Sequence, residues 1–254
     1  MDADHLLQLY LTLWLALLGA VLGSFLCCAA DRGGLPRGRS CCDHCGRPLG
    51  AGELIPVFSY LRSRGRCRHC GGAIPGHVLG AELAGAVSFA ALAWRFGPCL
   101  ELVMWLILAA LLLLLGLIDG KEHLLPDKLL LAAAVNRVVF LFLLGQPLPE
   151  TLQTMALGSL GIALPLLGLS LVMDRVLGRE SLGGGDIKLL FVLGLYLSLL
   201  EMLLLLVAAC LLALVWALGR GKGEIPFGPF LAGGWLAVVL FGAPLLSWYQ
   251  SLLR

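Results

Sequence analysis

The sequence predicts an all-α polytopic membrane protein with about eight transmembrane helices and one small cysteine-rich loop domain. Of its 254 residues, 59% are hydrophobic and only 13% are charged, and the mean hydropathy is +0.94. Soluble domains rarely reach such values. The apolar residues are also gathered into runs close to the length of about 17–25 residues that crosses a bilayer. A single polar loop, rich in cysteine and arginine, interrupts this pattern.

Eight apolar runs are candidate spans. In chain order they are residues 6–28, 79–96, 100–118, 129–144, 154–173, 187–199, 202–218 and 230–248. The first run could be a cleaved signal peptide, but its head, Met1-Asp2-Ala3-Asp4-His5, lacks the Lys or Arg that such peptides carry. We therefore expect a retained first helix whose amino end lies outside the cell.

Basic residues set the expected orientation. Residues 29–78 contain eight arginines, at positions 32, 37, 39, 47, 62, 64, 66 and 68. Because Lys and Arg collect in cytoplasmic loops, this loop is predicted to be cytosolic. Alternation of eight spans then leaves only Arg95 and Arg254 outside. Arg137 falls within the fourth run, where we expect it to face a polar interior or a partner rather than lipid.

These features divide the chain into three expected parts. Residues 1–28 form a first transmembrane helix, residues 29–78 form the cytosolic loop domain, and residues 79–254 form a seven-helix membrane domain.

Two acids lie at the ends of apolar runs. Asp119 ends the third run and Asp186 precedes the sixth, so the predicted topology brings both to the cytosolic border of the membrane. Acids at such positions are costly and usually functional. Each could instead be a helix cap or a headgroup-zone residue. Asp127, which follows Pro126 at the start of the fourth run, fits that second interpretation better.

Three glycines, Gly183, Gly184 and Gly185, stand directly before Asp186. Each costs a helix about 0.8–1 kcal/mol relative to Ala. They would let backbone approach a neighbour or an extended peptide closely, although helix packing also uses small residues. The glycine fingerprints of phosphate loops are absent, so we expect neither nucleotide binding here nor a nucleic-acid partner.

Two carboxyls in a partly dehydrated site cannot both ionise easily, and one keeps its proton. The carboxylate can then take a proton from water while its acid partner polarises a peptide carbonyl. The pair Asp119 and Asp186 therefore suggests aspartyl protease chemistry, which needs no metal and no nucleophilic Ser or Cys.

The loop carries two Cys-x-x-Cys pairs, Cys42 with Cys45 and Cys67 with Cys70, with twenty-one residues between the inner cysteines. Four thiolates so spaced suit a tetrahedral structural zinc ion. Disulfides are the alternative, but cytosolic thiols stay reduced. Cys41, His44 or His69 could replace one ligand. A loop of about fifty residues holds little core, so zinc would supply its cross-link. The remaining cysteines are expected to be packing residues: Cys27, Cys28, Cys99 and Cys210.

Over nearly its whole length the chain resembles the bacterial type IV prepilin peptidases. The motifs that carry the resemblance are Gly23-Ser24-Phe25-Leu26, the paired cysteines with Gly65-Arg66-Cys67-Arg68-His69-Cys70, Glu82, Leu117-Ile118-Asp119 with Leu125-Pro126-Asp127, Gly183-Gly184-Gly185-Asp186-Ile187-Lys188, and Pro226-Phe227-Gly228-Pro229-Phe230.

The resemblance implies a Gly-x-Gly-Asp intramembrane aspartyl protease of the bacterial inner membrane, with Asp119 and Asp186 as its catalytic acids. Such enzymes remove the basic leader of type IV prepilins and pseudopilins after a glycine, at the cytosolic face. Bifunctional members then methylate the new amino terminus with S-adenosylmethionine. The zinc loop links this sequence to those members.

The glycines at 183–185 are candidate substrate-binding residues, and Glu82 is a candidate group near the substrate amine or an interface residue. Two alternative functions are a peptidase without methyltransferase activity and a proton- or cation-coupled membrane transporter. A transporter should show inverted repeats with broken midplane helices, and no persuasive repeat is visible.

Overall fold

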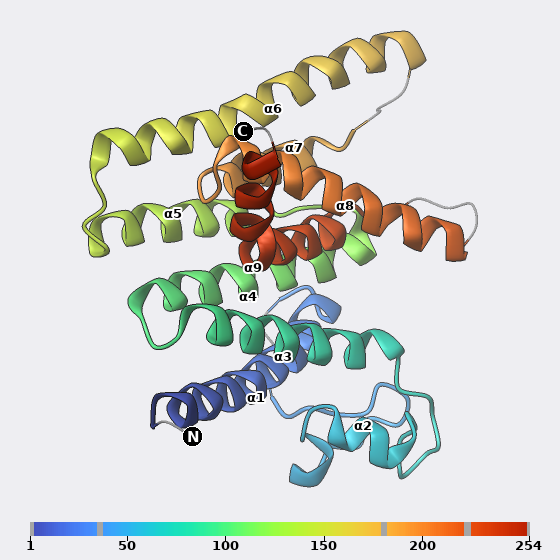
Figure 1. Ribbon diagram of the computed structural model, residues 1–254. Helices are drawn as coiled ribbons and strands as arrows, with labels where there is room; N and C mark the ends of the chain where they lie inside the picture. Colours follow the sequence, from blue (N-terminus) through green and yellow to red (C-terminus); the bar gives the residue numbers. More distant parts are fainter. Residues whose placement is uncertain (1–2, 35–37, 179–181, 221–224, 253–254) are drawn as a thin grey trace. The chain divides into compact units, whose positions relative to one another are not determined.

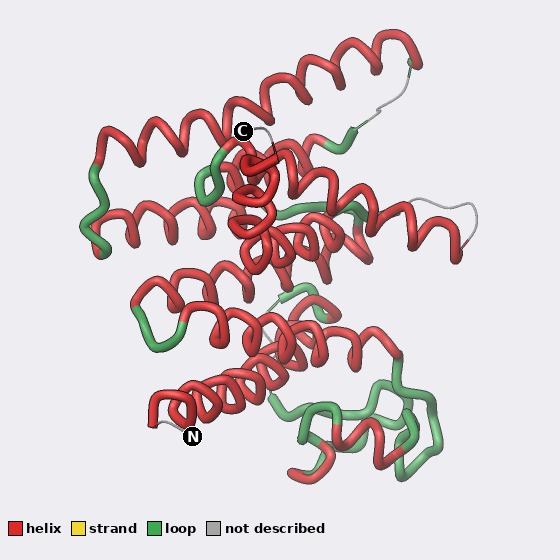
Figure 2. Tube along the Cα trace, in the orientation of Figure 1, coloured by secondary structure: helices red, strands yellow, loops and turns green. Residues whose placement is uncertain are grey.

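The computed structural model describes residues 3–34, 38–178, 182–220 and 225–252, and this described part is helical with no named strand (Figure 2). Arg37 and Arg254, used above for orientation, lie outside it. The chain forms two compact units, Met1–Leu102 and Val103–Arg254. The predicted all-helical class is therefore confirmed. The boundary between the units falls after Leu102. The three-part division expected from the sequence stays a prediction.

The first unit is a pair of helices that the cysteine-rich loop connects in the chain (Figure 1). Helix α1 (Ala3–Asp31) packs along α3 (Gly76–Phe96). The intervening loop contains a short 3-10 helix, η1 (Ala51–Glu53), and a six-residue helix, α2 (Phe58–Ser63). The loop therefore leaves and re-enters the helix pair at adjacent helix ends.

Glycines bring α1 and α3 into backbone contact. A Cβ added at Gly19 would collide with the carbonyl oxygen of Gly85, and one added at Gly85 would collide with that of Gly19. Gly23 faces the carbonyl of Ala81 in the same way. In a bilayer, helices associate through such close van der Waals contact rather than through hydrophobic burial. The side chain of Gln8 adds a hydrogen bond, from Nε2 to the carbonyl of Ala93, at 2.7 Å.

The described part of the second unit is built from six helices. They are α4 (Leu100–Glu122, whose first turn belongs to the first unit), α5 (Asp127–Leu143), α6 (Leu148–Leu177), α7 (Gly184–Gly194), α8 (Leu199–Arg220) and α9 (Gly228–Leu252). Helix α6 packs on α7 through Gly158 and Gly194, and α9 packs on α8 with Gly234 against Leu205 and Ala209. Small residues therefore mark both contacts.

Six of the eight expected spans are long and apolar enough to cross a membrane within the described residues: α1, α3, α4, α6, α8 and α9. Helix α5 has 17 residues and α7 only 11. At about 1.5 Å per residue, α7 covers roughly 16 Å, about half of the hydrocarbon thickness. The count of eight spans is therefore not confirmed, because the predicted run 187–199 includes the turn that ends α7.

Arg137 explains how α7 can end inside an apolar environment. Its Nε donates to the carbonyl of Leu195, just beyond α7, at 2.9 Å, and its Nη2 donates to Oε1 of Gln146 at 3.0 Å. Asn136 donates to the hydroxyl of Tyr196 at 2.9 Å. Irregular backbone is tolerated at membrane depth only where protein groups satisfy it. Arg137 is buried among these partners, as expected from its place in an apolar run.

The contact between α1 and α3 can be tested by substitution. Gly85→Val places two methyl groups against the carbonyl of Gly19, so it should lower the free energy of unfolding by about 1–3 kcal/mol or more. Gly80→Val is the matched control, because a side chain at Gly80 meets no described atom within 4 Å. Thermal melting in detergent micelles would measure both. Equal melting temperatures would show that the glycine contact is not needed.

Candidate functional site

Asp119 lies in the last turns of α4 and is buried, at 6% exposure. Its Oδ2 accepts a hydrogen bond of 2.8 Å from the backbone N–H of Gly228, the first residue of α9. A helix amino end carries partial positive charge, and its N–H groups bind anions. The amino end of α9 therefore supplies a hydrogen-bond donor to the buried Asp119 oxygen.

Gly228 is required at this point. A Cβ added there would lie 2.8 Å from Oδ2 and 3.2 Å from Cβ of Asp119. The next residue, Pro229, suits the first turn of a helix and packs near Gly116 on α4. The segment Pro226-Phe227-Gly228-Pro229-Phe230 thus brings the amino end of α9 onto Asp119.

Asp186 lies in the first turn of α7, outside the six candidate spans, and is half-buried. Burial raises the pKa of this carboxyl to about 6, and the negative charge of Asp119 adds to the rise. The two acids, 67 positions apart in sequence, are therefore near enough to influence each other electrostatically. One carboxyl with a backbone donor and one with a raised pKa form an unequal pair, suited to holding a single proton.

The three glycines form the start of α7. Gly183 is its N-cap residue and Gly184 its first residue. A side chain at Gly185 would press on Leu125, at 3.1 Å, and one at Gly183 would approach Oδ2 of Asp186, at 3.2 Å. A Cβ added at Gly184 would meet no described atom within 4 Å. Packing therefore accounts for Gly185, whereas the Cβ position of Gly184 is open.

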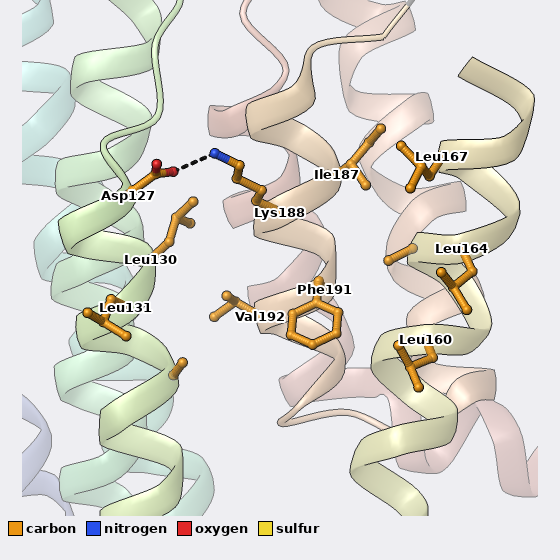
Figure 3. Close-up of a pocket in the computed structure, with 12 residues that line it drawn as sticks. Asp127, Leu130, Leu131, Leu160, Leu164, Leu167, Ile187, Lys188, Phe191 and Val192 are labelled. Carbon is orange, nitrogen blue, oxygen red and sulfur yellow. Dashed lines mark hydrogen bonds and ion pairs between the residues drawn. The ribbon is translucent and has the colours of Figure 1, made fainter. Parts of the chain in front are cut away.

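Lys188 connects the two acid-bearing motifs. Its Nζ pairs with Oδ1 of Asp127 at 2.8 Å, across from α7 to α5 (Figure 3). Asp127 lies in the first turn of α5, directly after the N-cap residue Pro126. Both side chains are largely exposed, so the pair is worth at most about 1 kcal/mol.

An apolar groove of about 460 Å³ begins at this ion pair and runs between α5, α6 and α7 (Figure 3). Ile187 and Phe191 of α7 face leucines of α6, including Leu164, across it. Ile187, which lines the groove, is the residue after Asp186 in the chain. Its lining suits hydrocarbon, whether a lipid chain or an apolar peptide segment.

The four expected cysteines meet in the loop of the first unit. The sulfur atoms of Cys42, Cys45, Cys67 and Cys70 all lie within 4.8 Å of one another, and those of Cys42 and Cys70 are 3.9 Å apart. Tetrahedral zinc with Zn–S bonds of about 2.3 Å separates its sulfurs by roughly 3.8 Å. The set therefore fits a zinc ion, which would cross-link the loop.

Two matching turns build this cluster. The N–H of Gly46 donates to the carbonyl of Cys42 at 2.8 Å, and that of Gly71 donates to Cys67 at 2.9 Å, with both glycines at positive φ. Backbone N–H groups of Cys70 and His69 lower the pKa of the Cys67 thiol to about 6, which favours the thiolate that a metal binds.

The other candidate ligands have different partners. His44 contacts the carbonyl of Ala73 at 3.3 Å, in the second turn. His69 contacts Arg47 at 3.0 Å, in the first turn. The sulfur of Cys41 lies 3.8 Å from the Arg32 guanidinium. The histidines therefore join the two turns to each other, and the four paired cysteines are the better ligand set.

Glu82 is buried in α3, at 5% exposure, and joins the loop to the helix pair. Its Oε2 accepts the backbone N–H of Val57 at 2.6 Å. Val57 has φ 61° and ψ −53°, a strained γ-turn conformation for a β-branched residue, and Phe58 N–H donates back to Pro56. The carboxylate thus holds a strained turn where α2 begins.

Sequence reasoning missed three of these contacts: Gly228 with Asp119, Arg137 with Leu195, and Glu82 with Val57. Only the first left a usable sequence signal. Gly228-Pro229 directly before an apolar run marks a helix start, and a helix start binds anions. It does not reveal which acid is bound.

The fold and the site define a multi-pass helical membrane protein that carries two electrostatically coupled carboxyls and a separate four-cysteine cluster. Residues 17–96 match the Bacterial Peptidase A24 N-terminal domain, and residues 106–218 match the Type IV leader peptidase family. The second match includes both Asp119 and Asp186. The chain belongs to the type IV leader peptidase family, so the resemblance read from its motifs is confirmed.

Several relatives carry the name prepilin leader peptidase/N-methyltransferase. The one from Bacillus subtilis (strain 168) is 34% identical over 92% of this chain and 96% of its own length. The one from Burkholderia pseudomallei (strain K96243) is 37% identical over 91% of this chain and 77% of its own length. The one from Aeromonas hydrophila is 34% identical over 84% of this chain and 75% of its own length. No solved structure gives a significant match.

The cysteine cluster predicts a clear metal dependence. Cys42→Ser or Cys67→Ser removes one of four ligands, so each should lower the zinc content by about one ion per chain and make the loop sensitive to proteolysis. Cys210→Ser, on exposed α8 surface, is the control and should keep the full content. Elemental analysis of protein purified in detergent measures the ratio. Full zinc retention in the Cys42 and Cys67 variants would contradict this ligand set.

Proposed function

We propose that this protein is a prepilin leader peptidase that also N-methylates the new amino terminus of its product. The observation that carries the peptidase half is the electrostatic coupling of Asp186 to Asp119, in a family whose members are named for leader cleavage. The substrates would be type IV prepilins or pseudopilins, cut after a glycine at the end of a basic leader.

In the proposed reaction, the two acids have different roles. Asp119, bound by the Gly228 N–H, is the carboxylate that takes a proton from water. The hydroxide attacks the peptide carbonyl carbon while Asp186, whose raised pKa of about 6 keeps a fraction of it protonated near neutral pH, donates its proton to the carbonyl oxygen. A proton then passes to the leaving nitrogen as the C–N bond breaks, and one proton again remains on the pair.

The substrate must present unwound backbone to these acids. A helical peptide carbonyl is already hydrogen-bonded, and free backbone near the membrane is tolerated only inside protein or a wet cavity. The open space at Gly184, in the turn that carries Asp186, supports a peptide approach there. Gly183 and Gly185, which lack side chains, would let the same turn lie close to Asp186 and Leu125.

The proposed location is the bacterial cytoplasmic membrane, with the loop and both acids on the cytosolic side. The arginines of residues 29–78 support this orientation. The bilayer is then the protein's immediate partner, and basic leaders reach the acids from the cytosol.

We propose that methylation belongs to the first unit, and its four-cysteine loop and the relatives' names as N-methyltransferases support this. S-adenosylmethionine would be the donor. In the three-part division expected from the sequence, residues 29–78 are the methyltransferase-associated domain and residues 79–254 the peptidase. Glu82, which ties α3 to the loop, would act near the substrate amine or keep the loop in place.

One experiment separates the two activities. The purified protein is incubated with a prepilin and labelled S-adenosylmethionine, and leader loss and methyl incorporation are followed separately by mass. Leader loss without methyl incorporation would support the proposed peptidase activity and contradict the proposed methyltransferase activity. If neither leader loss nor methyl incorporation occurs, the whole proposal is refuted.

Replacing either acid should abolish cleavage. Asp119→Asn and Asp186→Asn each remove one half of the proton pair, so leader removal should fall by roughly three orders of magnitude while the melting temperature stays near that of the wild type. Asp127→Asn, at the exposed pair with Lys188, should cleave within a few-fold of normal. Substantial cleavage by either single variant would remove that acid from the mechanism.

The role of Gly184 can be separated from packing. Gly184→Val adds a side chain whose Cβ has no described atom within 4 Å, so we expect the fold to be retained. If a peptide approaches this turn, cleavage should fall at least tenfold, chiefly through a raised KM. Gly168→Val on α6, which also meets no described atom, is the matched control. Normal cleavage by Gly184→Val would place the substrate elsewhere.

A further inference from the structure

A second group of metal-ligating side chains lies at the base of the loop. Cys27 and Asp31 are one turn apart on α1, and His77 is the second residue of α3. Their ligand atoms all lie within 4.8 Å of one another. Sequence reasoning assigned Cys27 to packing, because nothing in the sequence brings residue 77 beside it.

The separations suit a single bound cation. His77 Nε2 lies 3.4 Å from Asp31 Oδ2, and Cys27 Sγ lies 3.8 Å from the same oxygen. Tetrahedral zinc with its usual bond lengths separates nitrogen from oxygen by about 3.4 Å and sulfur from oxygen by about 3.6 Å. Without a cation, the same contacts are an ion pair from His77 and a weak thiol hydrogen bond from Cys27, both to Asp31 Oδ2. A cation would instead hold all three ligand atoms at once.

The three side chains differ in how deeply they are buried. Cys27 is 1% exposed, whereas the side chains of Asp31 and His77 are 32% and 44% exposed. The sulfur would thus bind from the protein side, and the opposite side is open to solvent. Three protein ligands with one open position leave room for a water molecule as the fourth ligand.

We propose that Cys27, Asp31 and His77 form a second Zn²⁺ site, separate from the four-cysteine cluster. Thiolate, imidazole and carboxylate together favour zinc over magnesium or calcium, which select oxygen ligands. Asp31 ends α1 and His77 lies in the first turn of α3, so the ion would join the two points where the loop leaves and re-enters the helix pair.

The test is zinc stoichiometry of the full-length protein purified in detergent. Wild type should hold about two zinc ions per chain, and His77→Ala and Asp31→Asn about one, since each removes one of only three protein ligands. His5→Ala, matched in residue type to His77→Ala, should keep about two, as should Cys28→Ser, which changes the cysteine next to Cys27. Melting temperatures would verify that all variants fold.

Cobalt substitution gives a second measurement. Cys42→Ser leaves the proposed site intact, so cobalt bound by that variant should show the weaker sulfur charge-transfer absorption of a single thiolate. The further change His77→Ala should remove it. A wild-type content of about one zinc ion, or His77→Ala protein that still holds about two, would overturn the proposal.

Discussion

The hydrogen bond from the Gly228 N–H to Asp119 is the contact on which the second unit's chemistry depends. A carboxylate that is 6% exposed in an apolar helix bundle is strongly disfavoured unless a donor compensates it. That donor is a helix amino end, 109 positions away in sequence. It can reach the oxygen only because residue 228 has no side chain. The position of α9 and the hydrogen bonding of Asp119 are therefore set together.

Asp186 is governed by a different balance. It lies at the start of a short helix, is only half-buried, and has a pKa of about 6, raised by burial and by Asp119. The helix can be short because Arg137 satisfies the backbone where α7 ends. A buried arginine in α5 thus lets α7 remain within half a bilayer thickness, with its acid-bearing turn at one end.

Much of this could be predicted from the sequence, because it depends on composition and local spacing. The helical membrane class, the two acids at helix ends and the cysteine pairs all follow from residues near one another in the chain. The length of α7 could not be predicted, because its last turn depends on an arginine 58 positions earlier. Glu82 likewise stood as an isolated acid, since its partner is a backbone N–H in a turn 25 positions earlier. Contacts of this kind depend on the final packing of helices.

The two matching cysteine turns also fix an order of assembly. Cys42 and Cys45 leave the ribosome before Cys67 and Cys70, so at first only two of the four cysteine ligands are present. A stable four-thiolate ion can bind only after residue 70 has emerged, by which time α1 is complete and α3, starting at Gly76, is next in the chain. A zinc ion held by all four thiolates would tie the two halves of the loop together. It would thereby shorten the free chain between the two helices that meet at Gly19 and Gly85.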